Sequence, residues 1–163
     1  MTLTAWRITT ASHANRAFDG EGARLHGGRW NSVGTPVVYL AENCALAVLE
    51  MLVHIEFAAA MDRYVLIPVT FDLHLVRTLQ KRNVPRDWSA NPSPLSTQAV
   101  GDKWVAQGHD LLLSVPSALV PSERNFLLNP KRPDFSKLHI GAPQKFKFDP
   151  RFFTNPQSGR TSL

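Results

Sequence analysis

The chain has 163 residues, 44% of them hydrophobic, and its 18 basic and 13 acidic residues give a formal net charge of +5. This length supports one hydrophobic core and is too short for two comfortable domains, so we expect a single domain. Cys44 is the single cysteine, which excludes an internal disulfide, and the sequence has no HExxH or other compact metal-ligand spacing that would indicate a metal site.

The hydrophobic residues predict neither a secretion signal nor a membrane span. The first twenty residues hold no long apolar block after a basic start, and the most apolar stretch, residues 46–61, is interrupted by Glu50, His54 and Glu56. We therefore expect a cytoplasmic protein with no membrane partner. The positive charge favours an anionic partner, but Lys and Arg are scattered without a dense basic arm, so we expect no direct contact with nucleic acid.

The first half of the chain predicts a strand followed closely by a helix. Residues 37–40 have the β-branched and aromatic character of a short buried strand, and Asn43 can cap a helix after it. Two apolar stripes at helical spacing predict that this helix is buried on two sides; they are Ala45, Val48, Leu49, Leu52 and Ile55, and Leu46, Val53 and Phe57. Glu50 lies within the second stripe, where burial of its charge requires a partner or a ligand.

The second half predicts further strands and one more helix. Residues 63–71 read as a strand in which Pro68 argues for an edge position or a bulge. The Pro-, Ser- and Asn-rich residues 83–97 predict a surface excursion that leads into a helix at residues 95–107, anchored by Trp104 and ended by Gly108. Strands are expected at residues 110–115, 126–128, 137–140 and 144–148, and the tail after Arg151 is expected to fray, although Phe152 and Phe153 can dock.

Three polar side chains of different chemistry follow one another at intervals of ten and eleven residues: Arg29, Tyr39 and Glu50. They fall on a predicted loop, strand and helix. An arginine binds phosphate, a phenol stacks or hydrogen-bonds, and a carboxylate in an apolar helix stabilises positive charge that develops on a sugar carbon. The combination predicts a nucleotide-sugar site, while a structural Glu50 paired with a nearby Arg or His is the competing interpretation.

The segment GGRWNSVGTPVVYLAENCALAVLEMLVH, which holds these three residues, resembles the core signature of the RES domain. Members of this family are toxins of bacterial toxin–antitoxin pairs, and their partners are Xre-type antitoxins. The resemblance extends over roughly residues 5–152: it includes Trp6-Arg7, the approach FDGEGARLHGGRWN and the later run VPSALVPSERNFLLNPKRPDF.

The resemblance implies an α+β fold, in which a single compact domain has an ADP-ribosyltransferase-like mixed β-sheet core with flanking helices. We expect the domain to span residues 1–152 and a C-terminal tail to span residues 153–163. The implied activity is cleavage of the nicotinamide–ribose bond of NAD+, a substrate rather than a cofactor, with phosphate, water or a protein side chain as the acceptor. Family members are NAD+ phosphorylases or hydrolases, and some transfer ADP-ribose to a protein. The implied partner is an Xre-family antitoxin, in a complex that can also contain a homo-oligomer of the toxin.

On this resemblance Arg29, Tyr39 and Glu50 match the family's functional Arg, Tyr and Glu and are expected to be catalytic. The family's Ser is assigned to Ser117, with Ser122 as the competing assignment. Since neither serine lies in a GxSxG elbow, we expect a binding role and no nucleophilic attack. The expected substrate-binding residues are Arg7, Gly28, Arg29, Tyr39, Ser117 and Asn125.

Some of these assignments have structural alternatives. Arg7 can recruit phosphate or be a strand-end surface residue, and Asn125, like Asn129, can bind ligand or cap a turn. Arg132 stands where many relatives carry His in an NP-x-H-P segment, so a role of that His is in doubt here.

Two other classes of function remain open. A small basic toxin can be a ribonuclease, with His54, His109 or His139 as acid and base, although their spacing supports no pair. The chain can also be a non-enzymatic binding module for an acidic partner, in which Glu50 is purely structural.

Overall fold

Eight strands form one mixed sheet in the computed structural model, which describes residues 1–55 and 63–153. They are β1 (Thr2–Thr10), β2 (Val38–Ala41), β3 (Tyr64–Asp72), β4 (Val76–Thr78), β5 (Leu112–Pro116), β6 (Arg124–Leu128), β7 (His139–Ile140) and β8 (Gln144–Phe146). The order is β4-β5-β6-β2-β1-β3-β7, and β8 also pairs with β3. Strands β4 and β5 are parallel and the other pairs antiparallel, so the mixed sheet of the expected α+β domain is confirmed.

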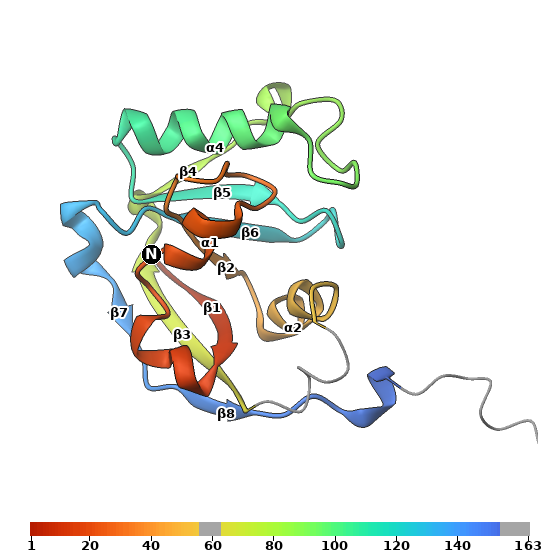
Figure 1. Ribbon diagram of the computed structural model, residues 1–163. Helices are drawn as coiled ribbons and strands as arrows, with labels where there is room; N and C mark the ends of the chain where they lie inside the picture. The colour runs from red at the N-terminus through yellow and green to blue at the C-terminus, as the bar shows by residue number, and fades with distance from the viewer. Residues whose placement is uncertain (56–62, 154–163) are drawn as a thin grey trace, which may run out of the picture.

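The sheet is curled, and its two halves diverge between β1 and β2. Strands β1 and β3 pair along nine residues, whereas the register between β1 and β2 consists of the pair Trp6–Ala41. In Figure 1 the half with β5 and β6 lies across the half with β1 and β3. Because β1 leaves β2 beyond this pair, the backbone of β2 is open to a side chain there, and Arg7 of β1 reaches it.

Helices α1 (Glu21–His26), α2 (Cys44–Leu52) and α4 (Leu95–Gln107) flank the sheet, with short 3-10 turns at Ala11–Arg16, Leu73–Leu75, Lys81–Asn83, Pro133–Lys137 and Pro150–Phe153. Asn125 and Leu127 point to the same face of β6, since alternate residues of a strand share a face. Asn125 bonds to Glu50 of α2, and Leu127 packs in one cluster with Trp104 of α4. Both helices therefore lie against one face of the sheet (Figure 1).

Helix α4 has the bounds that the sequence predicts and is packed unusually close to the chain before β2. Trp104 is buried, and Gly108 ends the helix in the left-handed region at φ 61° while its N–H donates to the carbonyl of Trp104. A Cβ at Gly101 would lie 1.6 Å from the carbonyl oxygen of Trp30. Only glycine fits at position 101, so α4 lies directly against the segment that carries Arg29.

Helix α2 begins as predicted but is not buried on two sides. The side chain of Asn43 caps it by accepting the N–H of Leu46 at 2.8 Å. Leu46 and Ala47 are buried, but Leu49 and Val53 are 42% and 56% exposed. The expectation of two-sided burial is therefore wrong, because both predicted stripes have exposed members and Ala45, Leu49 and Val53 form an outward line along the helix; Phe57 lies outside the described residues.

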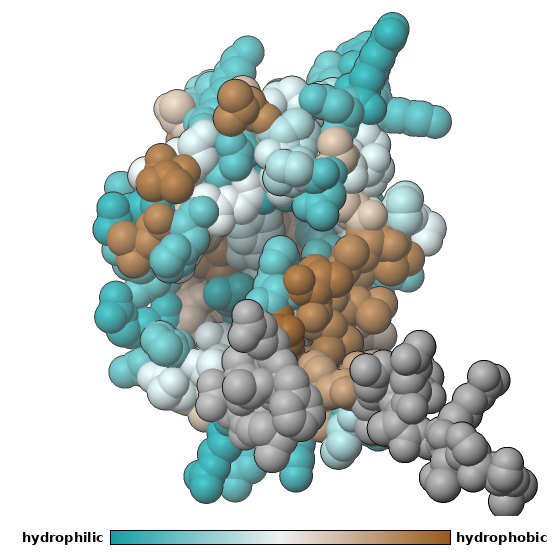
Figure 2. Space-filling view, turned by 45° about the vertical axis from the view of Figure 1, so that its right-hand side comes forward, coloured by the Kyte–Doolittle hydropathy of each residue, from teal (hydrophilic) through white to brown (hydrophobic). Residues whose placement is uncertain are grey.

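The outward side of α2, which includes Leu49 and Val53, is part of a hydrophobic surface that is hollowed beside the C-terminal segment. Figure 2 shows this surface as a brown patch over α2. A hollow of about 490 Å³ is bordered by residues that include Val48, Leu49, Phe146 and Phe152. Phe153 docks against Phe148, with ring centroids 6.3 Å apart, whereas Phe152 is exposed.

Pro68 occupies a gap in the hydrogen-bonding of β3, which is an interior strand. On one side it pairs with Trp6 of β1. On the other side β8 pairs with residues 64–66 and β7 with residues 69–70, so Pro68 falls between two short partners. Because no described strand pairs with Pro68 on that side, its missing N–H removes no hydrogen bond between strands. The predicted edge position of this strand is therefore wrong. Among the described residues, no helix combines the length and apolar character needed to cross a membrane.

Candidate active site

Glu50 is held by two side chains that donate to the same carboxylate oxygen. Its Oε1 accepts a hydrogen bond from Oγ of Ser117 at 2.7 Å and from Nδ2 of Asn125 at 2.6 Å. Oε2 has no hydrogen-bond partner among the residues that the structure describes. The contacts join helix α2 to the end of β5 and the start of β6. The carboxylate is therefore fixed through one oxygen, and the other is left for a ligand.

Ser117 is fully buried, and all of its hydrogen-bonding capacity is used. Its Oγ donates to Glu50 and accepts the N–H groups of Leu119 at 3.2 Å and Val120 at 3.1 Å. Ser122, the competing assignment, is exposed and makes no such contact. Of the two serines, Ser117 is the one brought to Glu50, where it positions the carboxylate. The geometry gives no nucleophile–histidine pair at this serine.

Tyr39 lies deep in the site, and its hydroxyl group is doubly bonded. The hydroxyl donates to Oδ1 of Asn31 at 2.8 Å and accepts the N–H of Trp30 at 3.0 Å. Burial raises the pKa of Tyr39 well above its ordinary value; the charge of Glu50 also raises this pKa, and that of Arg29 lowers it. Tyr39 therefore stays protonated and cannot serve as a base near neutral pH. The charges of Arg29 and Glu50 both act on this hydroxyl, although no hydrogen bond joins the three residues among those that the structure describes.

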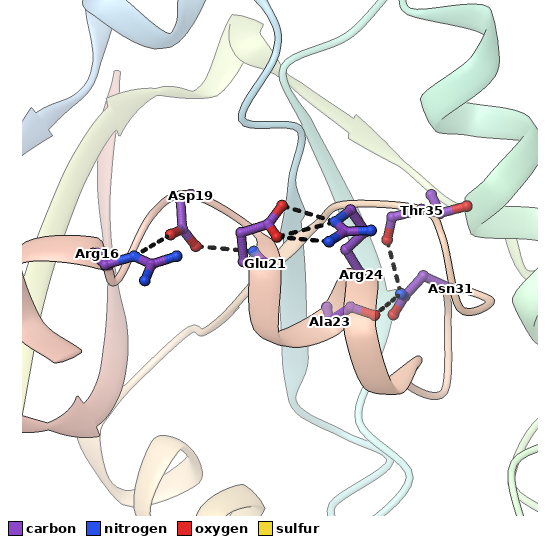
Figure 3. A network of polar contacts seen from close by, with 7 residues as sticks. All are labelled: Arg16, Asp19, Glu21, Ala23, Arg24, Asn31 and Thr35. Carbon is purple, nitrogen blue, oxygen red and sulfur yellow. Dashed lines mark hydrogen bonds and ion pairs between the residues drawn. The ribbon is translucent and has the colours of Figure 1, made fainter.

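Asn31 organises the loop between α1 and β2, and sequence reasoning missed it. It is fully buried, and its Nδ2 donates to the carbonyls of Ala23 at 2.8 Å and Thr35 at 3.0 Å (Figure 3). Asn31 thus fastens the loop to α1 and at the same time holds the hydroxyl of Tyr39. Its position shortly after Gly27 and Gly28 was the available signal, because Asn side chains commonly hydrogen-bond nearby backbone groups in turns.

Gly28 provides the space that Tyr39 occupies. A Cβ at this position would lie 2.6 Å from the Tyr39 hydroxyl oxygen and 2.8 Å from Oδ1 of Asn31. Its carbonyl accepts a hydrogen bond from Nε2 of Gln98 in α4 at 3.1 Å. The role that the geometry assigns to Gly28 is therefore close packing at the site.

Further polar contacts brace α1, on which this loop rests. The side chain of Asp19 accepts the N–H of Glu21 at 2.9 Å and pairs with Arg16 at 3.0 Å. Glu21 in turn pairs with Arg24 at 2.8 Å. Figure 3 shows these pairs running along α1 toward Asn31.

Within the part of the chain that the structure describes, the guanidinium of Arg29 is hydrogen-bonded to the protein through one nitrogen only. Its Nη1 donates to the carbonyls of Trp88 and Ala90, each at 2.8 Å. Nε and Nη2 have no hydrogen-bond partner among the described residues. One edge of Arg29 is thus fixed to the chain before α4, and the other edge is open to a ligand.

Arg7 is a largely buried cation without an anionic partner. Its Nη1 donates to the carbonyl of Tyr39 at 3.3 Å, while its Nε is buried and unpaired. It forms no ion pair with the residues described; the charge of Asp19 acts on it only at longer range. Burial lowers the pKa of Arg7, and Asp19 partly offsets this. A buried guanidinium in this state indicates a place for an anion.

The remaining candidates lie outside this group. Arg132 donates to the carbonyl of Gly108 and pairs with Asp134 at 2.9 Å, so it joins the end of α4 to the following turn. The side chain of Asn129 caps a turn by accepting the N–H of Lys131 at 3.1 Å. The three histidines of the ribonuclease reading, His54, His109 and His139, are all exposed. Burial raises the pKa of Cys44, which packs as a small apolar group, as expected.

Comparison with known protein families gives a match that covers most of the chain. The model of the RES domain matches residues 4–149. The chain belongs to the RES domain family. Relatives at this level of similarity are toxins by name, and the chain is accordingly a RES-domain toxin.

Two relatives by sequence and one solved structure of similar fold come from three bacteria. "Toxin Res" of Yersinia enterocolitica is 37% identical over 150 residues, covering 91% of this chain and 99% of that protein. "Prs ADP-ribosylating toxin" of Sphingobium sp. is 37% identical over 156 residues, covering 93% and 97%. The RES fold is also seen in the M. tuberculosis MbcT–MbcA toxin–antitoxin complex, where the matched chain has a TM-score of 0.70 at 22% identity and the match covers 90% of this chain and 85% of that one.

Proposed function

We propose that this RES-domain toxin cleaves the nicotinamide–ribose bond of NAD+. The observation that carries the proposal is Glu50, whose Oε1 takes hydrogen bonds from Ser117 and Asn125 and whose Oε2 is free among the described residues. Two neutral donors on one oxygen fix the direction of the carboxylate. This is the arrangement needed to stabilise a cation that exists only in the transition state.

The reaction proceeds by dissociation of a neutral leaving group. NAD+ binds with its nicotinamide ribose beside Glu50 and its nicotinamide near the ring of Tyr39. As the glycosidic bond breaks, its electron pair leaves with nicotinamide, and the ribose becomes an oxocarbenium ion that faces Oε2 of Glu50. An oxygen of phosphate or water then bonds to the anomeric carbon and releases its proton to solvent.

Arg7 and Arg29 bind the pyrophosphate. Arg29 offers Nε and Nη2, and Arg7 offers a largely buried charge with which no carboxylate of the described chain forms an ion pair. An anion supplied by the substrate satisfies both. The protonated Tyr39 hydroxyl takes no part in proton transfer and keeps the ring in place.

The alternative acceptor is a protein side chain. The name of the Sphingobium relative describes an ADP-ribosylating toxin, and the chemistry up to the oxocarbenium ion is the same. We further propose that the chain assembles with an antitoxin, since the protein of similar fold from M. tuberculosis was crystallised in a toxin–antitoxin complex. An Xre-family antitoxin is the expected partner.

The proposal is tested by following NAD+ and its products with and without inorganic phosphate. Wild-type protein should release nicotinamide, with ADP-ribose or its phosphorylated form as the second product. Glu50→Gln should lower the rate about a hundredfold or more, while Asp110→Asn, a carboxylate paired with Arg77 outside the site, should not. A folded Glu50→Gln protein with full activity would contradict the assignment, and intact NAD+ with the wild type would contradict the function.

A further inference from the structure

The segment of residues 84–94, between β4 and α4, is attached to the domain mainly at points beside the site. Trp88 packs against the cluster that contains Trp30 and Trp104. The side chain of Asp87 accepts a hydrogen bond from Oγ of Ser96 in α4 at 2.6 Å. Arg29 donates two further hydrogen bonds, to the carbonyls of Trp88 and Ala90. Oγ1 of Thr97 in α4 donates to the carbonyl of Pro94 at 2.8 Å. The rest of the segment is largely exposed.

These contacts make Arg29 a link between the segment and the site. Nη1 donates both of its hydrogens to the two carbonyls, which fixes the plane of the guanidinium. Nε and Nη2 then have only one direction in which to point. A lysine could not do this, because its single ammonium group has no second edge to orient.

We propose that residues 84–94 are a positioning element for Arg29, and that an anionic ligand on the free edge of Arg29 in turn stabilises this segment. The two bonds to carbonyls hold the guanidinium in one orientation, so a ligand loses less free energy in ordering it. Because binding free energies are reciprocal, a ligand that prefers the held Arg29 also favours the attached segment. The inference rests on the proposed function only for the identity of the anion, a dinucleotide pyrophosphate.

Limited trypsin digestion measures the attachment without any activity assay. Arg86 is an exposed cleavage site inside the segment, and Lys145 in β8 is an exposed site far from it in sequence that serves as the internal control. Arg29→Gln should raise cleavage after Arg86 relative to Lys145 about tenfold or more, because two charge-assisted hydrogen bonds are lost. Arg29→Lys, which keeps the charge and the stem, should raise the ratio by a smaller factor. Unchanged ratios in both variants would overturn the proposal.

Ligand coupling is tested in the Glu50→Gln protein, which binds NAD+ without consuming it. NAD+, and separately inorganic pyrophosphate, should protect Arg86 from trypsin in Glu50→Gln but not in the double variant with Arg29→Gln. Binding seen by calorimetry without protection would refute the coupling. If NAD+ does not bind at all, the proposed function fails, and the comparison of Arg29→Gln with wild type still decides whether Arg29 holds the segment.

A kinetic measurement separates positioning from general stability. Ser96→Ala removes the bond to Asp87 at the exposed end of the segment and leaves every site residue in place. It should raise KM for NAD+ severalfold with kcat unchanged. A fall in kcat at constant KM would contradict a role that acts through the binding residue Arg29.

Discussion

The acidic and basic sides of the candidate site are satisfied in opposite ways. Glu50 receives its donors from the protein, through Ser117 and Asn125, before any ligand is present. Arg7 is largely buried, yet none of the described carboxylates pairs with it. The fold thus orients the Glu50 carboxylate before any ligand binds. In the proposed function, the substrate supplies the anion that the arginines lack. Four changes test this contrast.

The largest effect is expected when both donors to Glu50 are removed. Ser117→Ala and Asn125→Ala should each lower kcat about tenfold, because a hydrogen bond to a charged group contributes on the order of 1.5–3 kcal/mol. The double variant should lose more than the product of the two, since in each single variant the remaining donor still restrains Oε1. Single-turnover rates measure this. Unchanged kcat in the double variant would show that Glu50 needs no orientation.

The next effect concerns Arg7 and should have opposite signs for binding and stability. Arg7→Met should weaken NAD+ binding about tenfold to hundredfold, because a charge-assisted contact to the pyrophosphate is lost. The same change should raise the melting temperature by roughly 2–5 °C, because a desolvated and unpaired charge is removed. Calorimetric titration and thermal melting check the two arms. A loss of stability would mean that Arg7 has a structural partner after all.

A smaller effect is expected for the hydroxyl of Tyr39. Tyr39→Phe keeps the ring beside the nicotinamide, so kcat/KM should fall less than about tenfold, the cost of leaving the N–H of Trp30 and Oδ1 of Asn31 unpaired. Since burial raises the pKa of Tyr39, the wild-type profile of kcat/KM between pH 7 and 10 should show no inflection that this variant removes. Such an inflection would instead make Tyr39 a titrating group.

The smallest effect lies at the opposite end of α2, where Glu42 lies near Glu123 and its Oε1 accepts the N–H of Arg124 at 2.8 Å. Burial raises the pKa of Glu42; the N–H of Arg124 opposes the rise and Glu123 adds to it. A carboxyl group with a raised folded-state pKa contributes stability that is present below its unfolded pKa and is lost as the pH rises through the folded value. Glu42→Gln should therefore raise the melting temperature slightly at pH 7–8 and hardly at pH 4. Equal shifts of the melting temperature at both pH values would contradict a raised pKa of Glu42.

Local patterns were sufficient for most elements of secondary structure. The Asn43 cap, the left-handed Gly108 and the strand before Ser117 follow from short-range rules. The hydrogen-bond partners did not, because Glu50 meets Ser117 and Asn125 across 67 and 75 residues of sequence and Arg29 meets Trp88 across 59. Such pairs depend on the register of the assembled sheet.

Burial was the other quantity that periodicity could not supply. The two apolar stripes of α2 are equally regular in the sequence, and only tertiary contacts decide that Leu46 is covered while Leu49 and Val53 face outward. A repeat of apolar residues fixes the faces of a helix and leaves open how many of them find a neighbour.

The close approach of Gly101 to the carbonyl of Trp30 fixes α4 against the segment that carries Arg29. Five residues before Gly101, Ser96 donates a hydrogen bond to Asp87 of the exposed segment. Asp102, the residue after Gly101, accepts the N–H of Ser32 at 2.9 Å. With no room for a single methyl group at position 101, the helix can neither slide nor turn about its axis. The spacing between its two anchor points, and with it the reach of Arg29, is thereby set by the absence of a side chain.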